Sequence, residues 1–429
     1  MRILHVNHGY PMRYNAGSEV YARNLAQAHV REGHEVAVFA REENPHRPEY
    51  ALHVEQDGSI DVHLVNLPRT WQRFADASVD AVFGDLVRTF EPGAVHLHHL
   101  NHLSIGLPEV AHRCGAVVVY TVHDFWLPCP RGQFIRWSMG AEPWPLCDEQ
   151  QDARCARECF GRAFTGLAER HDEDMRYWSG WVHARMNAVQ RQLAFIDCFA
   201  CPSQTVADAL VHRFPEVADR VVRRDYGFPV APRSLRKDGG PFTIGFLGTH
   251  TAPKGVDQLV RAFATLRGDV RLQVWGRARG QATEALRQLA EPMKDRVSFP
   301  GEYVNGSIFD AVMPGIDVVV VPSIWLENSP LVIHEAQQAR VCVVTADAGG
   351  MAEYVQDGVN GLLFRHRDEQ DLARVLQRLV DEPGLAASLG SRGYLGTPDG
   401  RVPTMAEDAA FLADLYARLG ARRERRVLP

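Results

Sequence analysis

The stretch from residue 321 to residue 336, VPSIWLENSPLVIHEA, constrains the fold of this chain more than any other part of it. An apolar run over 316–321 leads into it, and a helical spacing of apolar residues begins after Pro330. Proline is well tolerated in the first turn of a helix, and a short apolar run that ends in a polar turn is typical of a buried strand. We therefore predict a strand, a short turn and a helix.

The same turn predicts an anion site. The first backbone N–H groups of a helix have no partner within it, so the N–H groups within 329–331 are available to an anion. Glu327 lies in the turn, and Glu335 lies eight residues later, about one helical turn in. A nucleotide diphosphate fits this pattern, with its phosphates at the helix N-terminus and the two carboxylates placed for hydroxyl groups.

The length and composition favour a globular protein with two domains. A chain of 429 residues exceeds what one hydrophobic core usually supports, and 45% of its residues are apolar. The net charge of −6 argues against a general nucleic-acid binder. The sequence shows no secretory pattern, and no apolar run approaches the ~20 residues that span a bilayer. We expect a cytoplasmic protein; peripheral contact with the inner face of a membrane stays open.

The first 40 residues predict a strand, a helix and a second strand. Apolar runs over 3–6 and 35–40 flank a helical spacing over 20–30, so a parallel sheet is expected. Gly17 lies in the turn before the helix, where a glycine lets a backbone N–H approach a phosphate. The turn is not a GxGxxG motif, so an ordinary turn glycine is the alternative.

Four histidines gather around the end of the next strand pattern, 94–98: His96, His98, His99 and His102. Alternation places His96 and His98 on one face of the strand. A metal site is one interpretation, but the cluster contains no carboxylate or cysteine. We favour polar residues at a strand end that line a cleft.

His123 and Asp124 come directly after an apolar run over 116–122. Open α/β sheets bind ligands at the carboxyl ends of parallel strands. His123 could hydrogen-bond a sugar hydroxyl or a phosphate, and Asp124 could orient the imidazole or contact an acceptor. A polar pair without chemistry is the alternative.

Residues 125–160 form an irregular insertion rich in Pro, Trp, Gly and Cys. Its cysteines, Cys129, Cys147, Cys155 and Cys159, have the spacing C-x17-C-x7-C-x3-C, without paired C-x2-C knuckles. Four thiolates suit tetrahedral zinc, and a metal would hold a loop that is too long to hold itself by packing. Structural zinc is favoured over unpaired thiols and over an iron–sulfur cluster. A catalytic metal is disfavoured because four cysteines leave no open position.

A composition shift over 227–240, rich in Pro, Gly and Arg, predicts a linker between two domains. A second series of strand and helix patterns follows it. Lys254 stands beside Gly255 at the start of a helix, where its ammonium can neutralise a diphosphate; a solvated loop lysine is the alternative. Gly276 ends a strand pattern at 270–275 and joins the candidate binding residues.

Three further predictions concern helices. Residues 161–195 have a helical pattern, and Gly349–Glu353 reads as a glycine turn into a helix. A last amphipathic helix covers 404–420 and leads into an arginine-rich tail. The tail is interpreted as a solvated, frayed end, with contact to anionic lipid as the alternative. Its arginines are Arg418, Arg422, Arg423, Arg425 and Arg426.

With these residues in place, the chain resembles retaining nucleotide-sugar glycosyltransferases of the GT-B fold, specifically the large family-4-like group with an E-x7-E motif. The resemblance covers nearly the whole chain and is strongest from Phe242 to Phe364. The segment His123–Gln133, with its later cysteines, is similar to a subset that bears a cysteine-rich insertion. The order and spacing of several short motifs carry it: Gly17-Ser18-Glu19, Thr121-Val122-His123-Asp124, Lys254-Gly255, Pro322-Ser323, Glu327-Asn328-Ser329-Pro330, Glu335-Ala336, Gly349-Gly350 with Glu353, Asp357-Gly358 and Asn360-Gly361-Leu362-Leu363.

The resemblance implies an α/β protein with two Rossmann-like parallel-sheet domains that face each other across a cleft. Residues 1–230 would form the acceptor-side domain, including the insertion at 125–160. Residues 231–403 would form the domain that binds the nucleotide-sugar donor. Residues 404–429 would form a helix that packs back on the first domain.

The resemblance also implies a role for each candidate residue. Glu335 would hold the ribose hydroxyls, and Glu327 would contact the donor sugar near its 3- and 4-hydroxyls. Lys254 and the N–H groups around Asn328, Ser329, Pro330 and Leu331 would hold the diphosphate. Gly17 would approach the diphosphate from the other domain, and His123 would contact the donor sugar. One departure stands out: the arginine that often precedes the lysine by five or six residues is replaced by Gly248 and Thr249, with His250 as the nearest substitute.

The implied activity is transfer of a hexose, with UDP as the favoured nucleotide, to a hydroxyl of a glycan, lipid-linked or small-molecule acceptor. His123, Lys254 and Glu327 are the candidate catalytic residues, and no cofactor or divalent metal is expected in the chemistry. Such a protein would serve polysaccharide or glycoconjugate biosynthesis. An epimerase or hydrolase of the same fold and a non-catalytic sugar-nucleotide binder are the alternatives. The sequence does not predict the oligomeric state.

Overall fold

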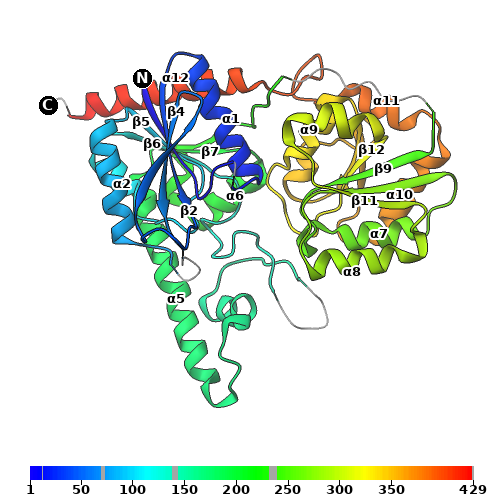
Figure 1. Ribbon diagram of the computed structural model, residues 1–429, viewed down its shortest axis with the longest axis horizontal. Helices are drawn as coiled ribbons and strands as arrows, with labels where there is room; N and C mark the ends of the chain where they lie inside the picture. The colour runs from blue at the N-terminus through cyan, green and yellow to red at the C-terminus, as the bar shows by residue number, and fades with distance from the viewer. Residues whose placement is uncertain (12, 69–72, 138–143, 231–238, 428–429) are drawn as a thin grey trace. The chain divides into compact units, whose positions relative to one another are not determined.

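A computed structural model describes the chain except for residues 12, 69–72, 138–143, 231–238 and 428–429, and except for the side chains of 424–427 (Figure 1). The chain forms two compact units. Unit 1 contains Met1–Pro229 and Pro403–Pro429, and unit 2 contains Val230–Val402. Each unit is built around its own sheet.

The sheet of unit 1 has the strand order β3-β4-β2-β1-β5-β6-β7-β8. All neighbouring strands are parallel except β3 and β4, which form an antiparallel pair at one edge. The central strands are entirely buried because helices cover both faces of a parallel sheet. The strands are β1 (Arg2–Val6), β2 (Glu35–Glu42), β3 (Leu52–Asp57), β4 (Ile60–Asn66), β5 (Ala94–Leu97), β6 (Val117–Thr121), β7 (Cys198–Cys201) and β8 (Val221–Arg223).

The helices of unit 1 are α1 (Gly17–Arg31), α2 (Ala77–Phe90), α3 (Leu107–Arg113), α4 (Asp152–Arg154), α5 (His171–Gln192), α6 (Gln204–Arg213) and α12 (Met405–Val427). The pattern over 161–195 predicts one helix, but α5 begins only at His171. Gly166 adopts a φ of +79°, in the left-handed region that a continuous helix excludes. Residues 161–170 therefore form only short 3₁₀ segments. None of the helices in the described part of the chain is long and apolar enough to cross a membrane.

The last helix, α12, belongs to unit 1 and packs along α1 (Figure 1). The buried carboxylate of Asp408 accepts hydrogen bonds from the Tyr21 hydroxyl at 2.7 Å and from the Arg224 guanidinium at 3.0 Å. In the arginine-rich tail, Arg423 pairs with Asp197 at 2.7 Å. The Arg423 side chain is thus held by contacts within unit 1 and is not a freely solvated end. The side chains of Arg425 and Arg426 lie outside the described residues.

The sheet of unit 2 has the order β11-β10-β9-β12-β13-β14, with every pair parallel. The strand order reverses between β9 and β12, and open α/β sheets bind ligands at such a switch point, beyond the carboxyl ends of the strands. The strands are β9 (Phe242–Leu247), β10 (Val270–Trp275), β11 (Val297–Gly301), β12 (Val318–Val321), β13 (Cys342–Ala346) and β14 (Gly361–Phe364).

Helices cover both faces of this sheet (Figure 1). One group contains α7 (Val256–Ala264), α8 (Gln281–Ala290) and α10 (Glu369–Asp381), and the other contains α9 (Leu331–Ala339) and α11 (Leu385–Arg392). The strand, turn and helix predicted around 321–336 are present as β12, a turn and α9. The prediction of a helix after Gly349 is wrong in length, since Gly349–Glu353 is a single 3₁₀ turn.

Candidate active site

The Glu327 carboxylate is the centre of a polar cluster in unit 2. Its Oε1 atom accepts hydrogen bonds from Lys254 Nζ at 2.6 Å, Ser323 Oγ at 2.6 Å and Trp325 Nε1 at 3.2 Å. Only 5% of Glu327 is exposed, and a carboxylate this deeply buried needs a cation and hydrogen-bond donors. These partners hold Glu327 in one orientation beside the ammonium group of Lys254.

Close contact between two loops brings Lys254 to Glu327. Gly255 has a φ of +67°, and a Cβ at this position would lie 1.8 Å from the Pro322 carbonyl oxygen. Ile324 N also donates to Pro253 O at 2.9 Å. The loop after β9 therefore lies directly against the loop after β12, at the switch point of the sheet.

A pair of glycines after β13 supports the turn from its other side. Gly350 N donates to the Glu327 carbonyl oxygen at 2.7 Å. A Cβ on Gly350 would lie 1.4 Å from the Asn328 carbonyl oxygen, and one on Gly349 would lie 2.8 Å from Leu326 Cα. No side chain larger than a hydrogen atom fits here unless the backbone moves.

The N-terminus of α9 follows the turn directly. Asn328 and Ser329 are buried, and Pro330 is the N-cap residue with extended backbone angles. Among the described residues, no side chain caps this helix, and its first turn, which begins at Leu331, carries no acidic residue. An anion therefore meets neither a competing side-chain cap nor an acidic residue in the first turn of the helix, and the nearby Glu327 is paired with Lys254.

Glu335 lies one turn into α9 and is partly buried. Burial raises the pKa of its carboxyl group to about 7, and the neighbouring His334 partly offsets this effect. Glu335 therefore titrates near neutral pH, unlike an exposed glutamate.

The backbone that follows β10 packs closely against the backbone that follows β9, at Gly276. This residue has a φ of +127°, and a Cβ on it would lie 1.9 Å from the Gly248 carbonyl oxygen. His250, the nearest substitute for the missing arginine, is buried, and its Nδ1 lies 3.2 Å from Thr283 Oγ1. Burial lowers its pKa, so His250 is unsuited to supply a cation.

In unit 1, Gly17 is the exposed first residue of α1. Glu19 in the same turn is buried and accepts hydrogen bonds from Ser18 Oγ at 2.9 Å and from His8 Nε2 at 3.2 Å. Although burial raises the pKa of Glu19, the contacts with His8 and Ser18 lower it to about 2. The N-terminus of α1 thus carries a fixed negative charge close to Gly17.

His123 and Asp124 follow β6, as predicted, and both side chains have hydrogen-bond partners within unit 1. The Nδ1 atom of His123 lies 2.6 Å from the Tyr226 hydroxyl, and its Nε2 atom lies 3.2 Å from Nδ1 of His98. Asp124 accepts hydrogen bonds from His99 at 3.3 Å and from the backbone of Trp126 at 2.8 Å. Burial lowers the pKa of His123 to about 3.

The prediction that the strand-end histidines line a cleft is wrong for His96 and His98. Both side chains are 0% exposed, because β5 is a central strand whose two faces are covered. The metal interpretation of this cluster is also weak. Ligand atoms of His5, His96 and His98 lie within 4.8 Å of one another, but each ring nitrogen of the three already has a hydrogen-bond partner in the protein.

The four cysteines of the insertion lie around one short π-helical turn. Cys155 and Cys159, at its two ends, are buried and share a hydrogen bond that raises the pKa of Cys155. Cys129 is buried as well, and Cys147 is partly exposed. In the described part of the chain, no three of these thiols lie within 4.8 Å of one another.

Several polar groups were not predicted from the sequence. Ser323 and Trp325, the other donors to Glu327, lie in the quoted motif without a role of their own. No spacing pattern in the sequence points to His5, His29 or Tyr226, because all three lie far from the strand-end histidines along the chain. The Pro322-Ser323 pair is the one signal that could have identified a donor.

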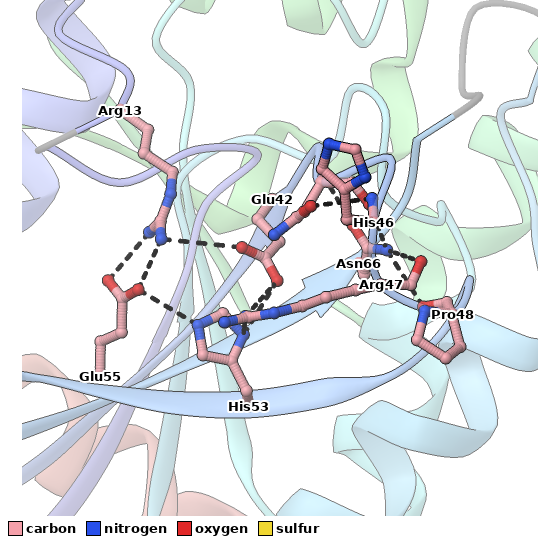
Figure 2. A network of polar contacts seen from close by, with 9 residues as sticks. Arg13, Glu42, His46, Arg47, Pro48, His53, Glu55 and Asn66 are labelled. Carbon is pink, nitrogen blue, oxygen red and sulfur yellow. Dashed lines mark hydrogen bonds and ion pairs between the residues drawn. The ribbon is translucent and has the colours of Figure 1, made fainter.

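A further unpredicted network lies where β2 ends (Figure 2). The buried Glu42 carboxylate pairs with Arg47 at 2.7 Å and His53 at 2.9 Å. Arg13 binds Glu55 through both terminal nitrogens, Nη1 and Nη2, which lowers the pKa of Glu55 to about 2. The Asn66 side chain donates to three carbonyl oxygens of the loop after β2. The network fixes the conformation of that loop.

Comparison with known proteins assigns both halves of the chain to glycosyltransferases. Residues 15–223 match Glycosyltransferase Family 4, and residues 241–382 match Glycosyl transferases group 1. The D-inositol 3-phosphate glycosyltransferase of Pseudarthrobacter chlorophenolicus is 25% identical over 390 residues, which cover 87% of this chain and 84% of that protein. The protein of the same name from Stackebrandtia nassauensis is 34% identical over 173 residues, 38% of this chain and 39% of that protein.

Solved structures show the same fold. Sucrose-phosphate synthase from Thermosynechococcus elongatus superposes with a TM-score of 0.68 at 18% identity, over 98% of this chain and 99% of that one. Anabaena Alr3699/HepE in complex with UDP and glucose superposes with a TM-score of 0.63 at 17% identity, over 100% and 99%. With its two parallel-sheet units and its two family matches, the chain is a GT-B glycosyltransferase.

Proposed function

We propose that this glycosyltransferase transfers a hexose from a UDP-sugar to a hydroxyl acceptor with retention of the anomeric configuration. The observation that carries the proposal is the buried Glu327 carboxylate, held by Lys254 directly before the uncapped N-terminus of α9. The solved complex of Anabaena Alr3699/HepE with UDP and glucose supports UDP as the nucleotide.

The proposed donor site uses the E-x7-E pair for hydroxyl groups and the positive groups for phosphate. Glu335 accepts hydrogen bonds from the ribose, and Glu327 accepts them from the donor sugar. Lys254 and the N–H groups within 329–331 hold the diphosphate. Gly276, at the end of β10, is proposed to contact the nucleotide. The proposal also includes two residues of unit 1, with the roles that the resemblance implies: Gly17 for the diphosphate and His123 for the sugar.

The proposed reaction breaks the bond between the anomeric carbon and the phosphate oxygen. Lys254 and the α9 N-terminus stabilise the charge that develops on the departing phosphate. A phosphate oxygen then accepts the proton of the acceptor hydroxyl on the same face of the sugar, which retains the configuration. Glu327 is engaged by three donors, and this argues against its acting as a nucleophile that forms a glycosyl–enzyme intermediate.

Turnover of UDP-, GDP- and ADP-sugars with an acceptor panel tests the proposal. The panel includes inositol phosphate, sugar phosphates, glycans and lipid-linked sugars, and mass spectrometry detects the product. Transfer from a UDP-hexose supports the proposal, and NMR of the product reports the configuration. Consumption of the donor without any acceptor would instead indicate an epimerase or hydrolase. Binding without turnover would indicate a sugar-nucleotide sensor.

The raised pKa of Glu335 predicts pH-dependent donor binding. The free protein favours the protonated carboxyl group below about pH 7, whereas two ribose hydroxyls are best accepted by the carboxylate. We expect UDP-glucose to bind about tenfold more weakly at pH 6 than at pH 8, because one pH unit below the pKa leaves about a tenth of the groups ionised. UDP-glucose is preferred to UDP as the probe because its diphosphate has no ionisation in this range.

Calorimetric titration measures this effect, with Glu335→Gln as the control. The variant binds more weakly at pH 8 but loses the pH dependence, since a glutamine does not titrate. Equal affinity of the wild-type protein at both pH values would contradict the assignment of Glu335 to the ribose.

The proposal includes a structural zinc ion held by Cys129, Cys147, Cys155 and Cys159. The four thiols and the positive charge around them support this, since Arg154 Nη2 lies 3.6 Å from Cys147 Sγ and Arg131 lies next to Cys129 and Cys159. Metal binding would draw the thiols closer together than they lie in this structure. Zinc would displace the thiol protons and connect the π-helical turn to the parts of the insertion that carry Cys129 and Cys147.

Metal analysis of the purified protein tests the zinc site. We expect about one zinc ion per chain, and its loss in Cys155→Ser. Cys114→Ser is the matched control, since Cys114 is an exposed thiol outside the insertion. A wild-type protein that remains free of zinc and iron after expression with both metals would contradict the site.

A further inference from the structure

Four histidines of unit 1 form a continuous hydrogen-bonded row, which we call the imidazole row. Its members are His123 after β6, His98 after β5, His5 in β1 and His29 in α1. His98 and His29 are 0% exposed, and His5 is 1% exposed. Of the four, only His123 is partly exposed, at the carboxyl end of β6, and ligands bind at this edge of such sheets.

Each contact in the row joins one nitrogen of one ring to the opposite nitrogen of the next. His123 Nε2 lies 3.2 Å from His98 Nδ1, and His98 Nε2 lies 3.0 Å from His5 Nδ1. His5 Nε2 lies 3.1 Å from His29 Nδ1. The row ends at the Ala409 carbonyl oxygen in α12, 3.2 Å from His29 Nε2.

The carbonyl at the end fixes the direction of every hydrogen bond. A carbonyl oxygen only accepts, so His29 must carry its proton on Nε2, and its Nδ1 must accept. His5 must then donate from Nε2 and accept at Nδ1. The same step applied to His98 and to His123 makes both of them Nε2–H tautomers.

All four imidazoles of the row are electrically neutral, so each ring has one nitrogen that donates and one that accepts. Burial lowers the pKa of His29 and His123 to about 3 and depresses the pKa of His5 and His98 well below the usual range. A charged imidazole would donate from both nitrogens, and the rings between it and Tyr226 would then have to be Nδ1–H tautomers. Deep burial without a carboxylate partner in the row excludes this arrangement at neutral pH.

We propose that the Ala409 carbonyl and the imidazole row lock His123 as its Nε2–H tautomer, so that its Nδ1 is a permanent acceptor that recognises a hydroxyl group. In this structure that hydroxyl belongs to Tyr226, 2.6 Å away. A neutral acceptor binds a sugar hydroxyl and repels a phosphate oxygen, which itself only accepts. His98, His5 and His29 are therefore positioning residues. A hydroxyl of the donor sugar would replace that of Tyr226 at Nδ1, and this assignment rests on the proposed function.

The Ala409 carbonyl oxygen also prevents the row from conducting protons as a proton wire. A wire passes a proton by reversing every bond in the row, and the reversed row would need a donor in place of the Ala409 carbonyl oxygen. The row therefore holds one orientation rather than conducting. His96 stacks on His98 with a centroid distance of 4.4 Å, but it bonds to Thr121 and Tyr416 and is not part of the row.

Nitrogen NMR of the histidine side chains in the full chain tests the lock directly. Protonated and unprotonated ring nitrogens resonate in separate regions, and single His→Gln variants assign the signals. We expect His29, His5, His98 and His123 all to be neutral Nε2–H tautomers at pH 7.5. A single Nδ1–H or doubly protonated ring among the four would overturn the proposal.

Two substitutions at His29 separate the lock from simple packing. Leucine offers neither donor nor acceptor, so His29→Leu frees the row to reverse, and His123 should shift towards the Nδ1–H form with about a fivefold rise in the KM for the donor. Glutamine can donate to Ala409 O and accept from His5, so His29→Gln should restore the Nε2–H form and most of the affinity. An unchanged His123 tautomer in a folded His29→Leu protein would contradict the lock.

Addition of UDP-glucose to the wild-type protein distinguishes failure of the lock from failure of the proposed function. If His123 contacts the sugar, its Nδ1 signal moves while Nε2 stays protonated. If all four tautomers are as assigned but UDP-glucose leaves Nδ1 unmoved, the lock stands and the role of His123 at the donor is wrong. Protonation of Nδ1 on donor binding would overturn the acceptor assignment itself.

Discussion

Lys254→Ala is expected to lower kcat for hexosyl transfer by about 10²–10³, the range measured when one preorganised stabilising donor is removed from an active site. Lys254 is the cation that the structure places against Glu327, at 2.6 Å, and its side chain is 35% exposed. Removing it takes away positive charge at the point where the departing phosphate becomes more negative. The loss should therefore fall mainly on kcat, with a smaller rise in the KM for the donor.

Steady-state kinetics at saturating acceptor measure the effect, and Lys294→Ala is the matched control. Lys294 lies in the same unit and pairs with Glu291 at 3.1 Å, but it is 69% exposed and far from the turn in sequence. The control should stay within about twofold of wild type, since exposed ion pairs contribute little. A Lys254→Ala enzyme with near wild-type kcat and an unchanged melting temperature would show that Lys254 takes no part in the reaction.

Gly350→Ala is expected to destabilise the protein by at least about 3 kcal/mol, at the upper end of overpacking effects. The added methyl group would lie 1.4 Å from the Asn328 carbonyl oxygen, so the turn that carries Glu327 must move. About 2–4 °C of melting temperature are lost for each kcal/mol in a domain of this size, so thermal unfolding should occur roughly 6–12 °C lower. Donor binding should be lost even below that temperature, because Gly350 also holds the Glu327 carbonyl oxygen.

Gly306→Ala is the control for this substitution. A Cβ on Gly306 meets no atom within 4 Å, and its φ lies outside the left-handed region. Such a replacement should be neutral or stabilise by about 0.4–1 kcal/mol through the unfolded chain. Equal melting temperatures for Gly350→Ala and Gly306→Ala would mean that the turn is not packed as described.

The order of strands and helices in unit 2 follows closely from sequence. Apolar runs such as Val318–Val321 end at proline or glycine, and helical spacing follows them, so local pattern alone indicates a parallel α/β unit. Helix lengths are less predictable. The pattern over 161–195 continues past Gly166, whose left-handed conformation is set by the fold around it rather than by its neighbours in sequence.

The candidate site was predicted as a set of residues but not as a set of contacts. Lys254 and Glu327 are 73 residues apart, and they meet only because two loops cross at the switch point with a glycine between them. The imidazole row is harder still, since it joins β1, α1 and the ends of β5 and β6. His98 looks like a strand-end polar residue in sequence, but Tyr21 of α1 and the ring of His96 pack against it, and it is fully buried.

The central claim is that the segment from Glu327 to Glu335 binds the donor, and a crystal structure of the complex with UDP-glucose tests it most directly. The ribose should lie within hydrogen-bond distance of the Glu335 carboxylate, and the diphosphate should contact Lys254 and the N–H groups within 329–331. Density for the nucleotide at any other place, with this segment unoccupied, would contradict the account.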